Sequence, residues 1–109
     1  MIKMYGIKNC DSVKKAQKYL QLNNIDFEFI DFRQNPISAD TLQTFVDALG
    51  WDKLINRRST TYRNLSDVEK SNITIALTLK NPTLIKRPVL VTAVDTLVGF
   101  SEKSYSALI

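Results

Sequence analysis

The pattern of apolar and polar positions begins with two strand-like segments separated by a helix-like one. A short apolar run at residues 2–5 predicts a buried first strand, which Gly6 ends. Apolar residues then recur at helical spacing, with three lysines on the opposite side, from about Asp11 to Asn23. Residues 27–32 alternate aromatic and acidic side chains, as a strand does. Two strands joined by such a helix predict a parallel, right-handed β-α-β unit.

The next segment contains the clearest helical stripe of the chain. Pro36 and Ser38 open it, and Gly50 is placed as its C-terminal stop. The stripe consists of Leu42, Phe45, Val46 and Leu49. Residues 51–55 continue as a short apolar element. We therefore expect a helix followed by a short extension.

Residues 56–64 carry three arginines and no apolar periodicity, so we expect a loop there. Ser66 and Glu69 match a capping box at the start of another helix. A further helical stripe is stopped by Asn81 and Pro82. That stripe consists of Ile73, Ala76, Leu77 and Lys80.

The last part of the chain changes to strand periodicity. Residues 88–92 and 96–100 predict two strands, and the three residues between them suit an antiparallel hairpin. Ser101 is placed to cap a final helix towards Ala107. The full order, β-α-β, helices, then β-β-α, predicts an α/β protein with a thioredoxin-like core and a mixed four-stranded sheet. We expect a single domain over 1–109, with a helical insertion at about 36–84.

Composition narrows the possible chemistry. One cysteine and no histidine among 109 residues exclude an internal disulfide, a structural zinc site and a Cys–His pair. The net charge of +4 comes from scattered residues, so we do not expect direct nucleic-acid binding. The sequence shows neither a signal-peptide pattern nor a run long enough to cross a membrane. We expect a cytoplasmic monomer that binds no metal.

Cys10 is the first candidate for chemistry, because it lies between a predicted strand and a predicted helix. The free N–H groups and the dipole at a helix start favour a thiolate. Helix starts and basic neighbours lower a cysteine pKa. Lys8 adds positive charge nearby, whereas Asp11 opposes the thiolate. The alternative is a half-buried cysteine without a role.

Basic residues elsewhere form two further candidates. Arg87 precedes Pro88, which opens a strand. In a thioredoxin-like fold this proline faces the cysteine loop and is commonly cis, which would bring Arg87 beside Cys10. Arg57 and Arg58 lie in the polar segment and suit an oxyanion or a carboxylate. The alternative for both groups is a solvated basic surface.

Residues 5–16, 85–91 and 97–101 together justify naming a family. The first stretch closely resembles the opening of the YffB-type proteins, which belong to the glutaredoxin-coupled arsenate reductase and Spx family. The second is similar to that family's second signature, and the third to the ending typical of the YffB group. The resemblance covers essentially the whole chain. It implies a thioredoxin-like core with an inserted helical region.

The resemblance also implies roles for individual residues. In the arsenate reductases a cysteine thiolate attacks arsenate, three arginines hold the oxyanion, and glutathione with glutaredoxin completes the cycle. Cys10 matches the nucleophile, Arg57 (or Arg58) the first arginine and Arg87 the second. The third position falls near Phe100.

Three residue types of the wider family are missing. Gly6 stands where the arsenate reductases carry a histidine, and no arginine follows Arg87. Val13 stands where the Spx regulators carry the second cysteine of a Cys-x-x-Cys switch, so a single thiol must be resolved by an external one.

The leading hypothesis is a thiol oxidoreductase that uses glutathione as co-substrate and has no bound cofactor. Glutaredoxin is its expected protein partner. Cys10 is its nucleophile. Six residues are predicted to bind the thiolate, an oxyanion or glutathione: Lys8, Asn9, Arg57, Arg58, Arg87 and Pro88. One alternative is a non-catalytic interaction protein that binds RNA polymerase as the Spx proteins do. The other is an arsenate reductase proper.

Overall fold

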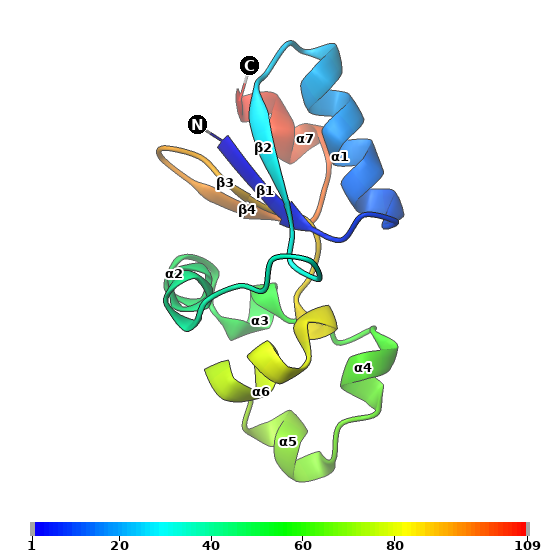
Figure 1. Ribbon diagram of the computed structural model, residues 1–109, viewed down its shortest axis with the longest axis vertical. Coiled ribbons are helices and arrows are strands. Elements are labelled where there is room, and N and C mark those ends of the chain that lie inside the picture. Colours follow the sequence, from blue (N-terminus) through cyan, green and yellow to red (C-terminus); the bar gives the residue numbers. More distant parts are fainter. Residues whose placement is uncertain (1, 109) are drawn as a thin grey trace. The chain divides into compact units, whose positions relative to one another are not determined.

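The computed structural model describes residues 2–108, and Figure 1 shows their helices and strands. The chain divides into two compact units. The sheet unit combines the residues up to Asn35 with those from Arg87 onward, and the helical unit is the continuous segment Pro36–Lys86. None of the helices within residues 2–108 is long and apolar enough to cross a membrane.

The sheet unit contains four strands in the order β2-β1-β3-β4. Strand β1 pairs in parallel with β2 and antiparallel with β3, and β3 pairs antiparallel with β4. Its elements are β1 (Ile2–Gly6), α1 (Asp11–Leu22), β2 (Phe27–Asp31), β3 (Val89–Val91), β4 (Thr96–Val98), α7 (Glu102–Tyr105) and the 3-10 helix η2 (Ser106–Leu108). This β-α-β and β-β-α arrangement is a thioredoxin-like fold, as the sequence predicts.

One face of the sheet carries the core of this unit. Met4 of β1 and Leu90 of β3 are fully buried against the helices and are partners in the strand register. The other buried members come from α1 and α7, so both helices pack on that face. They are Val13, Ala16, Leu20 and Tyr105. The core therefore joins the first and last segments of the chain.

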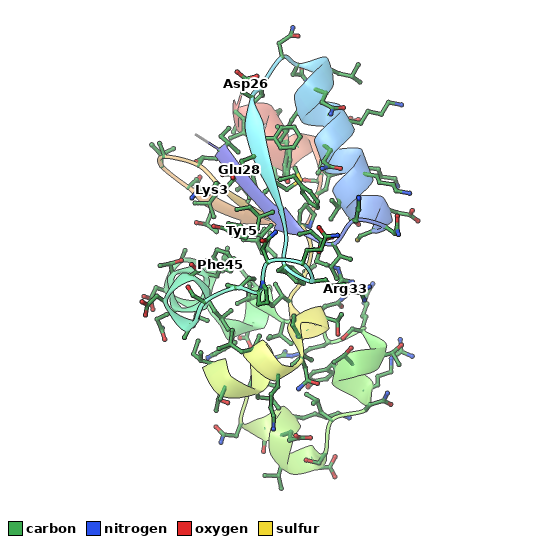
Figure 2. All side chains as sticks on the ribbon, in the orientation of Figure 1. Lys3, Tyr5, Asp26, Glu28, Arg33 and Phe45 are labelled. Carbon is green, nitrogen blue, oxygen red and sulfur yellow. The ribbon has the colours of Figure 1, made fainter. Side chains whose placement is uncertain are left out.

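The strand residues that alternate with Met4 and Leu90 lie on the other face of the sheet. Lys3 and Glu28 are register partners on β1 and β2, both are exposed, and Figure 2 labels them. Opposite charges facing each other across two strands stabilise the pairing modestly. Tyr5 follows Lys3 on the same face of β1. Along β1, exposed Lys3, buried Met4 and half-buried Tyr5 reproduce the alternation expected of a half-buried strand.

The helical unit consists of short helices whose starts are capped by hydroxyl side chains. Ser38, Ser59, Ser66 and Thr74 each accept a hydrogen bond from a backbone N–H of the following first turn. The elements are α2 (Ala39–Leu49), α3 (Trp51–Leu54), α4 (Thr60–Arg63), α5 (Asp67–Ser71), α6 (Ile75–Lys80) and the 3-10 helix η1 (Pro82–Leu84). Gly50 ends α2 with φ of 78°, a backbone conformation that favours glycine.

Two expectations for this unit are wrong in detail. The sequence predicts a loop at residues 56–64, but these residues include α4, because the Ser59 hydroxyl accepts the N–H of Tyr62 and closes one helical turn. The stripe expected from Ile73 begins later, since Thr74 caps α6 and leaves Ile73 outside it. Ala76 of that stripe is exposed. The capping box of Ser66 is confirmed.

Candidate functional site

Cys10 is the residue at the start of α1, where the chain passes from extended into helical backbone. Its carbonyl oxygen accepts the N–H of Lys14 at 3.0 Å and so begins the helix. The side chain is half-buried and is a free thiol. The sulfur does not meet the geometry of a full capping hydrogen bond. The backbone N–H groups of Val13 and Ser12 nevertheless interact with it and favour its charged form.

The topology of the sheet brings Arg87 to the same place. Strands β1 and β3 are antiparallel, with Tyr5 opposite Val89. The residues that follow β1 and those that precede β3 therefore meet at the same end of the two strands. The Arg87 guanidinium donates to the Cys10 sulfur. The Arg87–Pro88 peptide bond is cis, and Pro88 is buried, with its carbonyl oxygen accepting the N–H of Gly99 at 2.9 Å.

These neighbours decide the charge state of the thiol. Burial acts to raise the pKa of Cys10, and this is the largest single effect. The N–H of Val13, the hydrogen bond and charge of Arg87, and the N–H of Ser12 together outweigh it. The pKa of Cys10 therefore lies below its ordinary value of 9.0. A thiol in this state has more thiolate near neutral pH, and the thiolate is the nucleophile.

Asp31 positions the loop that carries Cys10, a role that the sequence pattern alone does not predict. It ends β2 and is only 8% exposed. Its carboxylate accepts the N–H of Lys8 at 3.2 Å and that of Arg33 at 2.9 Å. The N–H of Phe32 donates in addition to the carbonyl of Gly6 at 3.0 Å. The end of β2 thus fixes the loop that carries Cys10.

A signal for Asp31 exists in the sequence. In the strand pattern it has the same parity as Phe27 and Phe29, whose side chains pack on the core face. A carboxylate on the core side of a strand needs hydrogen-bond donors, and backbone N–H groups of an adjoining loop are the common ones.

The remaining predicted residues differ in their surroundings. Lys8 and Asn9 are exposed beside Cys10 in the loop. Arg57 belongs to the helical unit, where its guanidinium pairs with Asp52 at 2.8 Å; both side chains are largely exposed. The backbone carbonyl of Arg58 accepts from the Arg63 guanidinium at 2.7 Å. Exposed pairs of this kind stabilise a fold little.

Phe100, near the family's third arginine position, is part of an aromatic cluster. Its ring centroid lies 4.9 Å from that of Tyr105 and 5.8 Å from that of Tyr19. This position therefore contributes packing. Among residues 2–108, no group of three or more cysteine, aspartate or glutamate side chains is arranged to hold a metal ion.

Comparison with known proteins gives a consistent result. A family model described as the ArsC family matches residues 5–108. A Haemophilus influenzae protein, described only as uncharacterized, is 46% identical, covering 98% of this chain and 97% of its own. The global transcriptional regulator Spx of Streptococcus pyogenes is 29% identical, covering 100% of this chain and 85% of the regulator. A solved structure described as the YFFB protein has a TM-score of 0.92 and 36% identity, covering 98% of this chain and 97% of that one.

Proposed function

Because this chain belongs to the ArsC family, we propose that it is a thiol oxidoreductase whose nucleophile is Cys10 and whose reductant is glutathione. The observation that carries the proposal is the position of Cys10 at the start of α1 with Arg87 beside its sulfur. Arg87 and the first-turn N–H groups of α1 lower the pKa of this thiol. A lone thiolate of this kind starts an exchange reaction and requires an external thiol to finish it.

The proposed cycle has two exchange steps. First, the Cys10 thiolate attacks the glutathione sulfur of a substrate–glutathione mixed disulfide, forms a Cys10–glutathione disulfide, and releases the substrate as a thiolate. A second glutathione thiolate then attacks the glutathione sulfur of that adduct, which releases the Cys10 thiolate and oxidised glutathione. The two electrons come from glutathione, and the proton of its thiol ends on the released substrate.

Positive charge supports the binding part of the proposal. Glutathione carries two carboxylates, and guanidinium groups bind carboxylates through paired hydrogen bonds. Arg87 lies at the sulfur and serves one of them. Within the sheet unit, Lys8, Asn9 and Pro88 are proposed to contribute to glutathione binding. In the helical unit, Arg57 or Arg58 is proposed to bind a carboxylate. Glutaredoxin is the proposed protein partner, and the cytoplasm, where thiols are kept reduced, the proposed compartment.

The rate of Cys10 alkylation by iodoacetamide, measured against pH, tests the thiolate. The wild-type protein should react with a midpoint below 9.0, because Arg87 stabilises the charged sulfur. Arg87→Gln should move the midpoint upward and slow the reaction several-fold at pH 7. Arg33→Gln is the matched control, since Arg33 is an exposed arginine of the same unit, and it should change neither.

A glutathione adduct on Cys10 is the second requirement. Incubation with oxidised glutathione, followed by mass spectrometry, should give one adduct per chain, absent in Cys10→Ser. Reduced glutathione should then remove it. The proposal would be refuted if the alkylation rate had its pH midpoint at the ordinary value of 9.0 and no glutathione adduct formed on Cys10.

The similarity to a transcriptional regulator favours a second candidate, an interaction protein that binds RNA polymerase. In this case Cys10 is dispensable. Purified polymerase should then retain Cys10→Ser and the wild-type protein equally, and glutathione should not alter the binding. Retention that is lost in Cys10→Ser would contradict this candidate.

Arsenate reduction proper is the weaker catalytic alternative, because Phe100 occupies the region of the third arginine and is engaged in aromatic packing. An assay with arsenate, glutathione and glutaredoxin should give no arsenite above the level of Cys10→Ser. Arsenite production that depends on Cys10 would identify the oxyanion as the substrate instead of a mixed disulfide.

A further inference from the structure

A groove separate from Cys10 lies between α1 and the segment that joins β4 to α7. Its volume is about 280 Å³. We call it the α1 groove, and its lining residues are Lys15, Lys18, Tyr19, Leu22, Phe100 and Glu102. All of them belong to the sheet unit.

The walls of the α1 groove are apolar and preorganised. Tyr19 and Phe100 are half-buried, and both rings contact the buried ring of Tyr105. This packing fixes the two rings in place. Leu22 continues the apolar wall at the end of α1 and is 72% exposed. A side chain that covers Leu22 and the two rings removes their exposed apolar surface from water, which is favourable.

The charges of the α1 groove are mostly positive. Lys15 and Lys18 lie one helical turn apart on α1 and are both exposed. Within the described part of the chain neither lysine forms an ion pair. Glu102, at the first turn of α7, provides a single negative charge, so the groove carries a net charge of +1.

We propose that the α1 groove binds an acidic polypeptide segment through one aromatic or large aliphatic side chain. The apolar side chain packs on Tyr19, Leu22 and Phe100, and flanking carboxylates pair with Lys15 and Lys18. Sites that enclose a whole small-molecule ligand have volumes of roughly 300–1,000 Å³. A groove just below that range, with charges at its rim, suits one side chain of a longer chain. This proposal does not depend on the chemistry of Cys10.

A synthetic peptide with one tryptophan flanked on each side by two glutamates is the probe. Added to ¹⁵N-labelled protein at low salt, it should shift the backbone amide signals of residues 15–22 and 99–102. A peptide with lysines in place of the glutamates, and one with serine in place of the tryptophan, should each bind at least tenfold more weakly. Equal binding of either control, or shifts centred on Cys10 and Arg87, would overturn the proposal.

Charge variants test the same surface from the protein side. Lys15→Glu combined with Lys18→Glu should weaken the probe at least tenfold, and Glu102→Gln should strengthen it, because one repulsive carboxylate is removed. Lys14→Glu is the matched control: Lys14 is exposed on the same helix but does not line the groove. If Lys14→Glu weakens binding as much as Lys15→Glu alone, the attraction is a general one to net charge and the groove is not the site.

Discussion

At the scale of single residues, Cys10 couples chemistry to stability. Its folded pKa lies below the ordinary value, so the native state holds the thiolate more strongly than the unfolded chain does. This contribution is fully present above the ordinary pKa of 9.0 and is lost as the pH falls through the folded value. Between neutral pH and pH 9, stability relative to a protein without the thiol should therefore rise with pH.

Urea unfolding of the wild-type protein and Cys10→Ser at pH 6, 7, 8 and 9 checks this coupling. The free energy of unfolding of the wild type minus that of Cys10→Ser should increase as the pH rises. The other side chains are common to both proteins, so their contributions cancel in the difference. A difference that stays constant, or that changes in favour of Cys10→Ser, would contradict the thiolate as the native form.

Tyr105 provides a second prediction at this scale. Its side chain is fully buried, and its hydroxyl has no hydrogen-bond partner among residues 2–108. Burial raises the pKa of this phenol well above its usual range. A buried hydroxyl without a partner costs about 1–3 kcal/mol. Tyr105→Phe should therefore leave the free energy of unfolding unchanged or raise it by about 1–2 kcal/mol.

Chemical denaturation measures this effect. Tyr105→Leu is the comparison, because it removes the ring that contacts Tyr19 and Phe100 and should cost on the order of 2–4 kcal/mol. A loss of more than about 1 kcal/mol in Tyr105→Phe would mean that the hydroxyl has a stabilising partner.

At the scale of elements, the close contact of β1 and α1 is made possible by Gly6. A Cβ atom at this position would lie 2.7 Å from Cγ2 of Val13, which is buried at 1% exposure. The resemblance implies a histidine of the arsenate reductases at the position of Gly6 and the second cysteine of the Spx regulators at that of Val13. In this chain the two positions lie against each other.

A double-mutant cycle tests this arrangement. Gly6→Ala should destabilise the protein by about 1–3 kcal/mol through overpacking. Val13→Ala should destabilise it through a cavity. The loss of unfolding free energy in the double variant should be smaller than the sum of the two single losses by at least about 0.5 kcal/mol. The reason is that alanine at position 13 lacks the clashing methyl groups. Simple additivity, measured by urea unfolding, would show that the contact relaxes without cost.

The elements also mark the limits of sequence reasoning. The helices α1 and α2 are predictable because three turns of apolar residues at one spacing leave little alternative. Helix α4 is a single turn closed by one serine hydroxyl, so it is too short to show a period. In the candidate site, Cys10 and Arg87 follow from the strand order. Asp31 does not, because its role depends on the backbone N–H of Lys8, which lies 23 residues away in the sequence and is brought to it only by the fold.

At the scale of the whole molecule, the sheet unit is built from both ends of the chain. Met4 and Leu90 are register partners and both are fully buried. Leu90→Ala should destabilise the protein by about 2–5 kcal/mol. Because β3 pairs with β1, this loss should also reduce the hydrogen-exchange protection of β1 and β2.

Leu42→Ala is the matched variant in the helical unit, where Leu42 is fully buried in α2. Its loss of protection should be concentrated in α2 and α6, since these two helices belong to the same unit and contact each other. Hydrogen exchange followed by mass spectrometry distinguishes the two patterns. Identical patterns for Leu90→Ala and Leu42→Ala would mean that the chain unfolds as one cooperative unit.

The position of β3 also affects the protein during its synthesis. Cys10 leaves the ribosome early, but Arg87 follows it 77 residues later. At roughly 5–20 residues per second, the thiol spends about 4–15 seconds without the guanidinium that stabilises its charge. The nascent chain therefore carries a less reactive cysteine, and the contribution of Arg87 is added only when β3 joins the sheet.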